Sequence, residues 1–96
     1  MKHILVFILA GLLMSSAVPA AADDCYADYK AKKDAPLRLH YGVVQLFQGC
    51  SQSSAKSEIS ARIAKDGWTL LNVLSVFDAT QLAGKDASAG QYYLRY

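Results

Sequence analysis

Two cysteines and one histidine are the side chains with the clearest capacity for chemistry beyond the first 22 residues. Cys25 and Cys50 are 25 positions apart, whereas a redox motif places its cysteines two residues apart. A zinc site requires three or four ligands, and only His40 is available to join the two cysteines. In an exported chain this pair predicts one disulfide, Cys25–Cys50, with no metal and no cofactor.

His40 is also the only imidazole available for acid–base catalysis after residue 22. A hydrolase triad needs a nucleophile, a histidine and an orienting acid. No motif places a serine, a cysteine or an acid beside His40, which lies among apolar residues. We therefore expect His40 to be a partly exposed strand residue, whose replacement by alanine leaves stability nearly unchanged. The acids of residues 23–34 are explained by capping and solubility, so we assign no catalytic residue.

The first 22 residues predict the compartment of the protein. Lys2 gives a positive start, an apolar run without charge covers Ile4–Val18, and Ala20-Ala21-Ala22 offers small residues for cleavage. The run is shorter than the ~20 residues that span a bilayer. We therefore expect a signal peptide over 1–22, a mature chain beginning at Asp23, no stable membrane anchor and a periplasmic location, with secretion left open.

The length and net charge of the mature chain limit its number of domains and the classes of partner it can bind. Removing 22 of 96 residues leaves 74, which suits one small domain over 23–96. Lys2 leaves with the signal, so nine basic side chains face eight acidic ones, a net charge of +1. These signs are interspersed, which argues against nucleic acid as a partner.

The helices and strands that position these side chains can be predicted from the hydrophobic periodicity and from the residues that start or end each element. Asp24–Lys33 has helical spacing and ends before Pro36, which predicts a short N-terminal helix. From Leu37 to about Phe47 the period is two, which predicts a strand. Serines then precede a helix over Ala55–Asp66, with Ala55, Ile59 and Ile63 as its apolar stripe, Glu58–Arg62 as an exposed pair, and Gly67 as its end.

The remainder of the chain predicts two more strands. Trp68–Phe77 is apolar on both faces, which is typical of a central strand, and Trp68 is expected in the core. Asp78–Gly90 predicts a loop with a helical turn at Ala79–Leu82, and Gln91–Tyr96 a last strand. The fold class is therefore α+β: a β-α-β-β layer, with one helix packed on a three-stranded sheet, after a short N-terminal helix.

Three segments of this pattern resemble a family of small bacterial domains of unknown function. They are a Y-x-V-V strand at Tyr41–Val44, a helix-to-strand junction with G-W-x-L at Gly67–Leu70, and a final Y-x-L-K/R strand at Tyr92–Arg95. The chain departs from the family at Ala64 and Thr69, where glycine and glutamate are usual. The resemblance implies a fold and transfers no functional residue, and the chain looks like an exported, alphaproteobacterial-type member.

Tyrosines are the feature that bears most on function. Tyrosine is enriched in contact surfaces because it buries a large ring while its hydroxyl stays solvated. These rings form a candidate interaction surface or simply pack in the core. We expect a non-enzymatic binding or protein-interaction module, with a homodimeric envelope component as the alternative and a small hydrolase using His40 ranked below both. The tyrosines near the two mature termini are Tyr26, Tyr29, Tyr92, Tyr93 and Tyr96.

Overall fold

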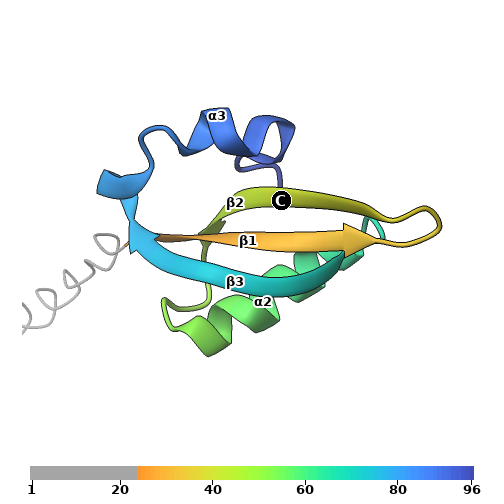
Figure 1. Ribbon diagram of the computed structural model, residues 1–96. Coiled ribbons are helices and arrows are strands. Elements are labelled where there is room, and N and C mark those ends of the chain that lie inside the picture. The colour runs from red at the N-terminus through yellow and green to blue at the C-terminus, as the bar shows by residue number, and fades with distance from the viewer. Residues whose placement is uncertain (1–23) are drawn as a thin grey trace, which may run out of the picture.

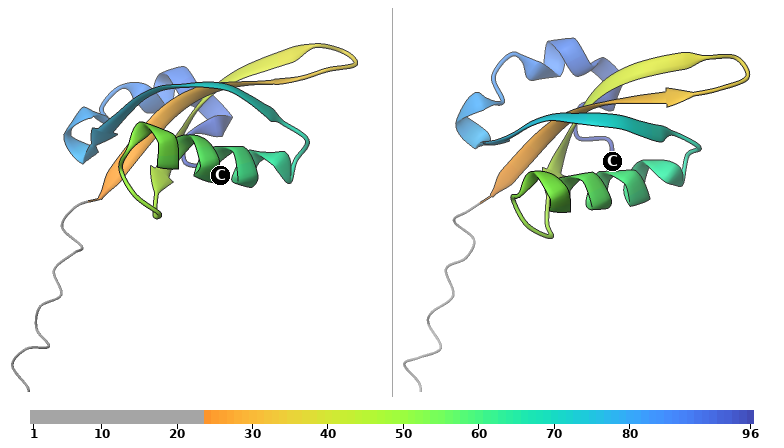
Figure 2. Two further views of the ribbon diagram at one scale, coloured as in Figure 1. Left: turned by 90° about the horizontal axis from the view of Figure 1, so that it is seen from below. Right: turned by 60° about the horizontal axis from the view of Figure 1, so that its bottom comes forward.

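The computed structural model describes residues 24–96, which form a three-stranded antiparallel sheet with helical segments on both faces (Figure 1). The strand order is β2-β1-β3. Helix α2 lies on one face, and the segment 79–93, which contains α3, covers part of the other (Figure 2). The predicted α+β class, with one helix packed on a three-stranded sheet, is confirmed. The elements are β1 Cys25–Lys33, β2 Arg38–Leu46, α2 Gln52–Ala64, β3 Thr69–Asp78, η2 Ala79–Gln81, α3 Lys85–Ala89 and η3 Gly90–Tyr92.

The predicted N-terminal helix is wrong, because Cys25–Lys33 forms β1, the central strand. The apolar buried residues of β1 alternate along the chain, since Cys25, Ala27, Tyr29 and Ala31 all face α2. Two small alanines in this row make the period of two hard to see, and the spacing of the tyrosines then imitates a helix. The Asp34–Leu37 segment does not end a helix but forms the turn of the β1–β2 hairpin.

Strand β2 confirms the period of two read from Leu37 onward. It pairs with β1 along its whole length, from Lys33–Arg38 to Cys25–Leu46. Gly42 lies opposite Tyr29, and a Cβ at this position would overlap the Tyr29 ring and hydroxyl. The absence of a side chain at Gly42 therefore makes room for the largest fully buried residue of the core.

Helix α2 confirms the predicted stripe, the serine cap and the stop at Gly67, but it runs from Gln52 to Ala64 and not from Ala55 to Asp66. Ser51 caps it by accepting a hydrogen bond from the Ser54 amide at 3.1 Å. At the other end the Trp68 amide donates to the Ile63 carbonyl and the Gly67 amide to the Ala64 carbonyl, which is the Schellman arrangement. Gly67 has φ +85°, as this motif requires. Trp68 is buried, as predicted.

Strand β3 is an edge strand, so the prediction that Trp68–Phe77 is central was wrong. Its register with β1 shifts twice, and the extra residues at the two shifts are Leu71 and Leu74. Both leucines are exposed. Each bulge adds one leucine that has no partner in β1 and that interrupts the alternation of the strand. The apolar pattern on both faces therefore does not mean that both faces are buried.

The predicted third strand at Gln91–Tyr96 is also wrong. Gly90–Tyr92 is a 3₁₀ turn, and within the described residues the β-type pairing of this segment with the sheet is a single parallel bridge between Val43 and Tyr93. Leu94 has φ +56°, a left-handed conformation that ends any extended run, while its amide donates to the Val43 carbonyl at 2.8 Å. The predicted helical turn after residue 78 is present as η2.

The two strands joined by α2 run parallel, but they are not neighbours. β2 and β3 are each antiparallel to β1, which lies between them. Strand β1 therefore separates the two parallel strands, and the connection through α2 crosses over it.

The predicted disulfide is present and joins the start of β1 to the segment before α2. Cys25 and Cys50 are bonded with a Cα–Cα distance of 5.9 Å. Such a bond is compatible with an oxidising, exported compartment. The signal expected over 1–22 lies outside the described residues.

Candidate functional site

His40 lies at the centre of an aromatic cluster between the sheet and α2. Its ring stacks on Tyr92 with centroids 3.7 Å apart and meets the Trp68 ring edge-on at 4.3 Å. Its Nε2 shares a hydrogen bond of 2.9 Å with the Tyr29 hydroxyl. Only 8% of His40 is exposed, so the expected partly exposed strand residue is in fact part of the core.

The environment of His40 keeps the imidazole neutral. Burial, together with the nearby Lys33 charge, lowers the pKa of His40 to about 4. Its contacts within the described residues are aromatic rings and the Tyr29 hydroxyl, and Nδ1 is buried without a hydrogen-bond partner. A general base works best with a pKa near the operating pH and with an orienting acid. The His40 geometry does not favour the hydrolase alternative.

The five candidate tyrosines do not form one surface. Tyr29, Tyr92 and Tyr96 gather around His40 on the α2 face of the sheet. Tyr26 and Tyr93 belong to a second cluster, with Val43, Phe77 and Ala89, on the α3 face. Tyr29 is fully buried and packs in the core, while the other four are partly exposed.

A buried acid fixes the α3 segment to the sheet. Asp28 accepts hydrogen bonds from the Tyr41 hydroxyl at 2.8 Å and the Ser75 hydroxyl at 2.7 Å, and Lys85 approaches it at 3.5 Å. Burial and the hydrogen bond to Asp28 raise the pKa of Tyr41 to about 12. From the sequence, Asp28 was interpreted as a residue for capping and solubility. Its burial could be predicted only if Cys25–Lys33 had been recognised as a strand.

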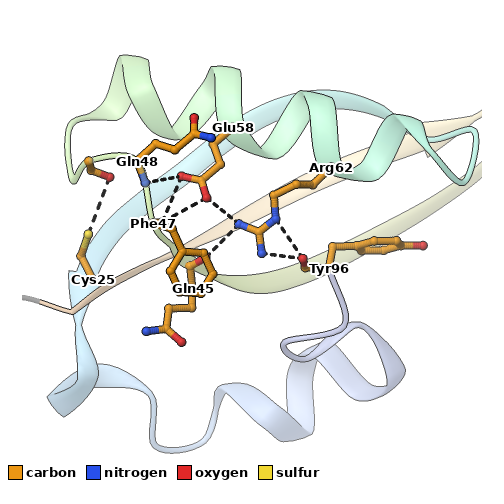
Figure 3. A network of polar contacts seen from close by, with 8 residues as sticks. Cys25, Gln45, Phe47, Gln48, Glu58, Arg62 and Tyr96 are labelled. Carbon is orange, nitrogen blue, oxygen red and sulfur yellow. Dashed lines mark hydrogen bonds and ion pairs between the residues drawn. The ribbon is translucent and has the colours of Figure 1, made fainter. Parts of the chain in front are cut away.

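A second polar network holds the end of the chain against α2 (Figure 3). The Glu58 carboxylate accepts from the Phe47 and Gln48 amides and from Arg62, whose Nη1 also donates to the Gln45 carbonyl at 2.8 Å. Nε and Nη2 of Arg62 donate to the main-chain oxygen of Tyr96. The i, i+4 spacing revealed this pair, but Glu58 is buried rather than on the exposed flank.

The outer side of β3 is the first surface with features of a binding site. The chain from Thr69 to Phe77 contains no charged residue and no proline, although natural edge strands use such residues to prevent pairing. Leu71 and Leu74, at the bulges, are 49% and 42% exposed. The Val73 carbonyl accepts a hydrogen bond of 2.9 Å from the Gln52 side chain.

A groove runs between this strand and the start of α2. It has a volume of about 420 Å³, and the residues that line it come from α2 on one side and β3 on the other. A helix beside an edge strand offers main-chain groups for an added strand and a wall for its side chains. The lining residues are Gln52, Ser53, Lys56, Leu71, Asn72 and Val73.

The second surface is the projecting end of the β1–β2 hairpin, which extends beyond α2 and β3 in both views of Figure 2. The α3 segment leaves this end of the sheet uncovered (Figure 1). A hollow of about 210 Å³ lies there, lined by Lys30, Leu39, Tyr41 and Leu71 among others. The sequence shows Lys30, Lys32 and Lys33 as a basic patch, which by itself indicates a solvated face. Neither surface could be located without the true position of β1.

Within the part of the chain that the structure describes, no three metal-binding side chains gather in one place. No helix of residues 24–96 has the length and apolarity required to cross a bilayer.

Comparisons with known proteins found no relative for this chain. It matches no family model, no curated protein and no solved structure. The resemblance to small bacterial domains of unknown function therefore stays an expectation.

Proposed function

We propose that this protein is an exported, periplasmic binding module that captures an extended segment of a partner protein along β3. The observation that carries this proposal is the β3 edge beside the groove, which has no charged residue and no proline from Thr69 to Phe77. An added strand would bond to the outward main-chain groups of β3 and take over the Val73 carbonyl from Gln52. Leu71 and Leu74 would supply apolar contact at the bulges.

The same edge supports the alternative of a homodimer. Two copies of β3 paired antiparallel across a two-fold axis would cover both edges at once. A homodimer would be a structural component of the envelope and not a receptor for another protein. In the first function a segment of another protein pairs with β3, and in the second the β3 strand of a second copy does. One experiment therefore distinguishes them.

Site-specific photo-cross-linking from residue 74 in the producing cell tests the proposal. Leu94 is the matched control, because it is a leucine of similar exposure that does not belong to β3. We expect an adduct with one partner protein from position 74 and none from position 94. A synthetic peptide of the cross-linked segment should then slow hydrogen exchange of the amides in 69–78.

The Leu74→Lys variant gives the functional readout. A lysine on an edge strand blocks pairing, and the site is exposed, so we expect binding of the peptide to be lost without a change in melting temperature. Leu94→Lys should bind normally. Equal loss in both variants, or protection of amides outside β3, would contradict the proposal. Adducts of the protein with itself would establish the homodimer instead.

A further inference from the structure

The end of the β1–β2 hairpin combines positive charge with exposed apolar side chains. Residues 30–38 contain four basic side chains and one acidic side chain, so their net charge is +3. The basic residues are Lys30, Lys32, Lys33 and Arg38, and the acid is Asp34. The whole chain carries only +2. The positive charge of the protein is therefore concentrated at one end of one hairpin.

Two leucines lie among these cations. Leu37 and Leu39 are 63% and 65% exposed. Neither belongs to the two hydrophobic core clusters of the described residues. Large exposed leucines at a projecting tip mark a contact surface.

The cations are distributed over both faces of the hairpin. Lys33 and Arg38 lie over the Trp68 ring on the α2 face, at 4.7 and 5.9 Å from its centroid. Lys30 and Lys32 alternate with these residues along β1 and so lie on the opposite face. Such a ring of charge suits a broad, flat anionic surface more than a peptide, which would meet one face only.

We propose that the hairpin tip docks reversibly on an anionic phospholipid surface. Leu37 and Leu39 enter the interface between head groups and acyl chains, and the four cations contact the phosphates around them. The projection of the hairpin lets the tip reach a flat bilayer before α2 or α3 touches it (Figure 2). This docking does not depend on the β3 groove.

Vesicle sedimentation with the mature protein tests this proposal. Phosphatidylcholine vesicles with phosphatidylglycerol should bind the protein, and pure phosphatidylcholine vesicles should not. Lys30→Gln with Lys32→Gln should weaken binding about 25-fold, about fivefold per lysine, which corresponds to about 1 kcal/mol for each cation. Lys56→Gln with Lys65→Gln removes the same charge from exposed positions on and just after α2 and should change binding far less.

The leucines are tested in the same way. Leu37→Ser with Leu39→Ser should abolish sedimentation with the anionic vesicles, while Leu94→Ser should not. Thermal melting checks that each variant folds, which the exposure of these positions favours. No binding of the wild type at low salt, or equal losses in the tip and control variants, would overturn the proposal. A tip that cross-links to a protein but ignores vesicles would overturn it too.

Discussion

At the scale of single residues, His40 shows how a titratable group becomes part of a core. It is held by ring contacts and by the Tyr29 hydroxyl, with no charged partner among its contacts in the described chain. Sequence reasoning expected a replaceable strand residue, and on that basis His40→Ala would leave stability unchanged. The packing instead predicts a loss of stability of about 2–4 kcal/mol for His40→Ala, in the range for large-to-small core substitutions.

His40 should also make stability depend on pH. The imidazole titrates at about 4 when folded and near 6.5 when unfolded. Above pH 6.5 both states are neutral; as the pH falls toward 4 the unfolded state binds the proton first, so stability is lost across this window. The shift corresponds to about 3 kcal/mol. Urea unfolding at several pH values should show this loss in the wild type.

The control for the pH effect is His40→Phe, which retains a stacking ring and cannot titrate. The difference in unfolding free energy between the two proteins should decline below pH 6.5. A difference that stays constant from pH 7 to pH 4 would show that His40 is protonated as readily in the folded protein as in the unfolded chain.

At the scale of elements, α2 is docked by a buried ion pair as well as by its apolar stripe. Glu58 satisfies two main-chain amides just after β2, and it shares Arg62 with the Tyr96 main chain. Glu58→Ala would leave these two amides without their acceptor and a partly buried guanidinium without its charge partner, so we expect a loss of about 3–5 kcal/mol. Chemical denaturation measures this loss.

The control for Glu58 is Lys65→Ala, which removes an exposed charge just after α2 and should change stability by less than about 0.5 kcal/mol. Hydrogen exchange adds a local readout. The amides of Phe47 and Gln48 should exchange faster in Glu58→Ala. Unchanged exchange at these two amides would contradict the role given to the carboxylate.

An element could be predicted from the sequence when the residues that define it lie close together in the chain. Helix α2 was predictable because its cap, stripe and terminal Gly67 all lie within one segment. Strand β1 was not, because small alanines hide its alternation until a helix is seen to cover it. Leu71 and Leu74 were misleading for the same reason, since a bulge is defined only against the neighbouring strand.

The candidate sites were less accessible to sequence reasoning than the fold. The tyrosines were a candidate surface with core packing as the alternative, and Tyr29 packs in the core, where it fills the space left by Gly42 on the neighbouring strand. That relation requires the pairing of β1 with β2, which the sequence did not predict. The β3 groove arises from strand order and has no local motif. The basic run of the hairpin tip is local in the sequence, but it projects only because residues 25–33 form a strand and not a helix.

At the scale of the whole molecule, one covalent bond joins parts that are otherwise held by a small core. The Cys25–Cys50 bond connects the central strand to the segment before α2 and closes a loop across a sequence separation of 25. A core of this size rarely supplies more than ~3–5 kcal/mol of net stability. Closing such a loop contributes about 3 kcal/mol in the chain-entropy model, which is close to the entire stability of the domain.

Removing both cysteines should therefore bring the protein to the edge of unfolding. We expect Cys25→Ala with Cys50→Ala to lose about 3 kcal/mol in urea denaturation, and reduction of the wild type to cause a similar loss. The agreement of these two values would separate the cross-link from the packing of the buried Cys25 side chain. A reduced protein that melts like the oxidised one would contradict this prediction, because it would show that the sheet and α2 are stable without the bond.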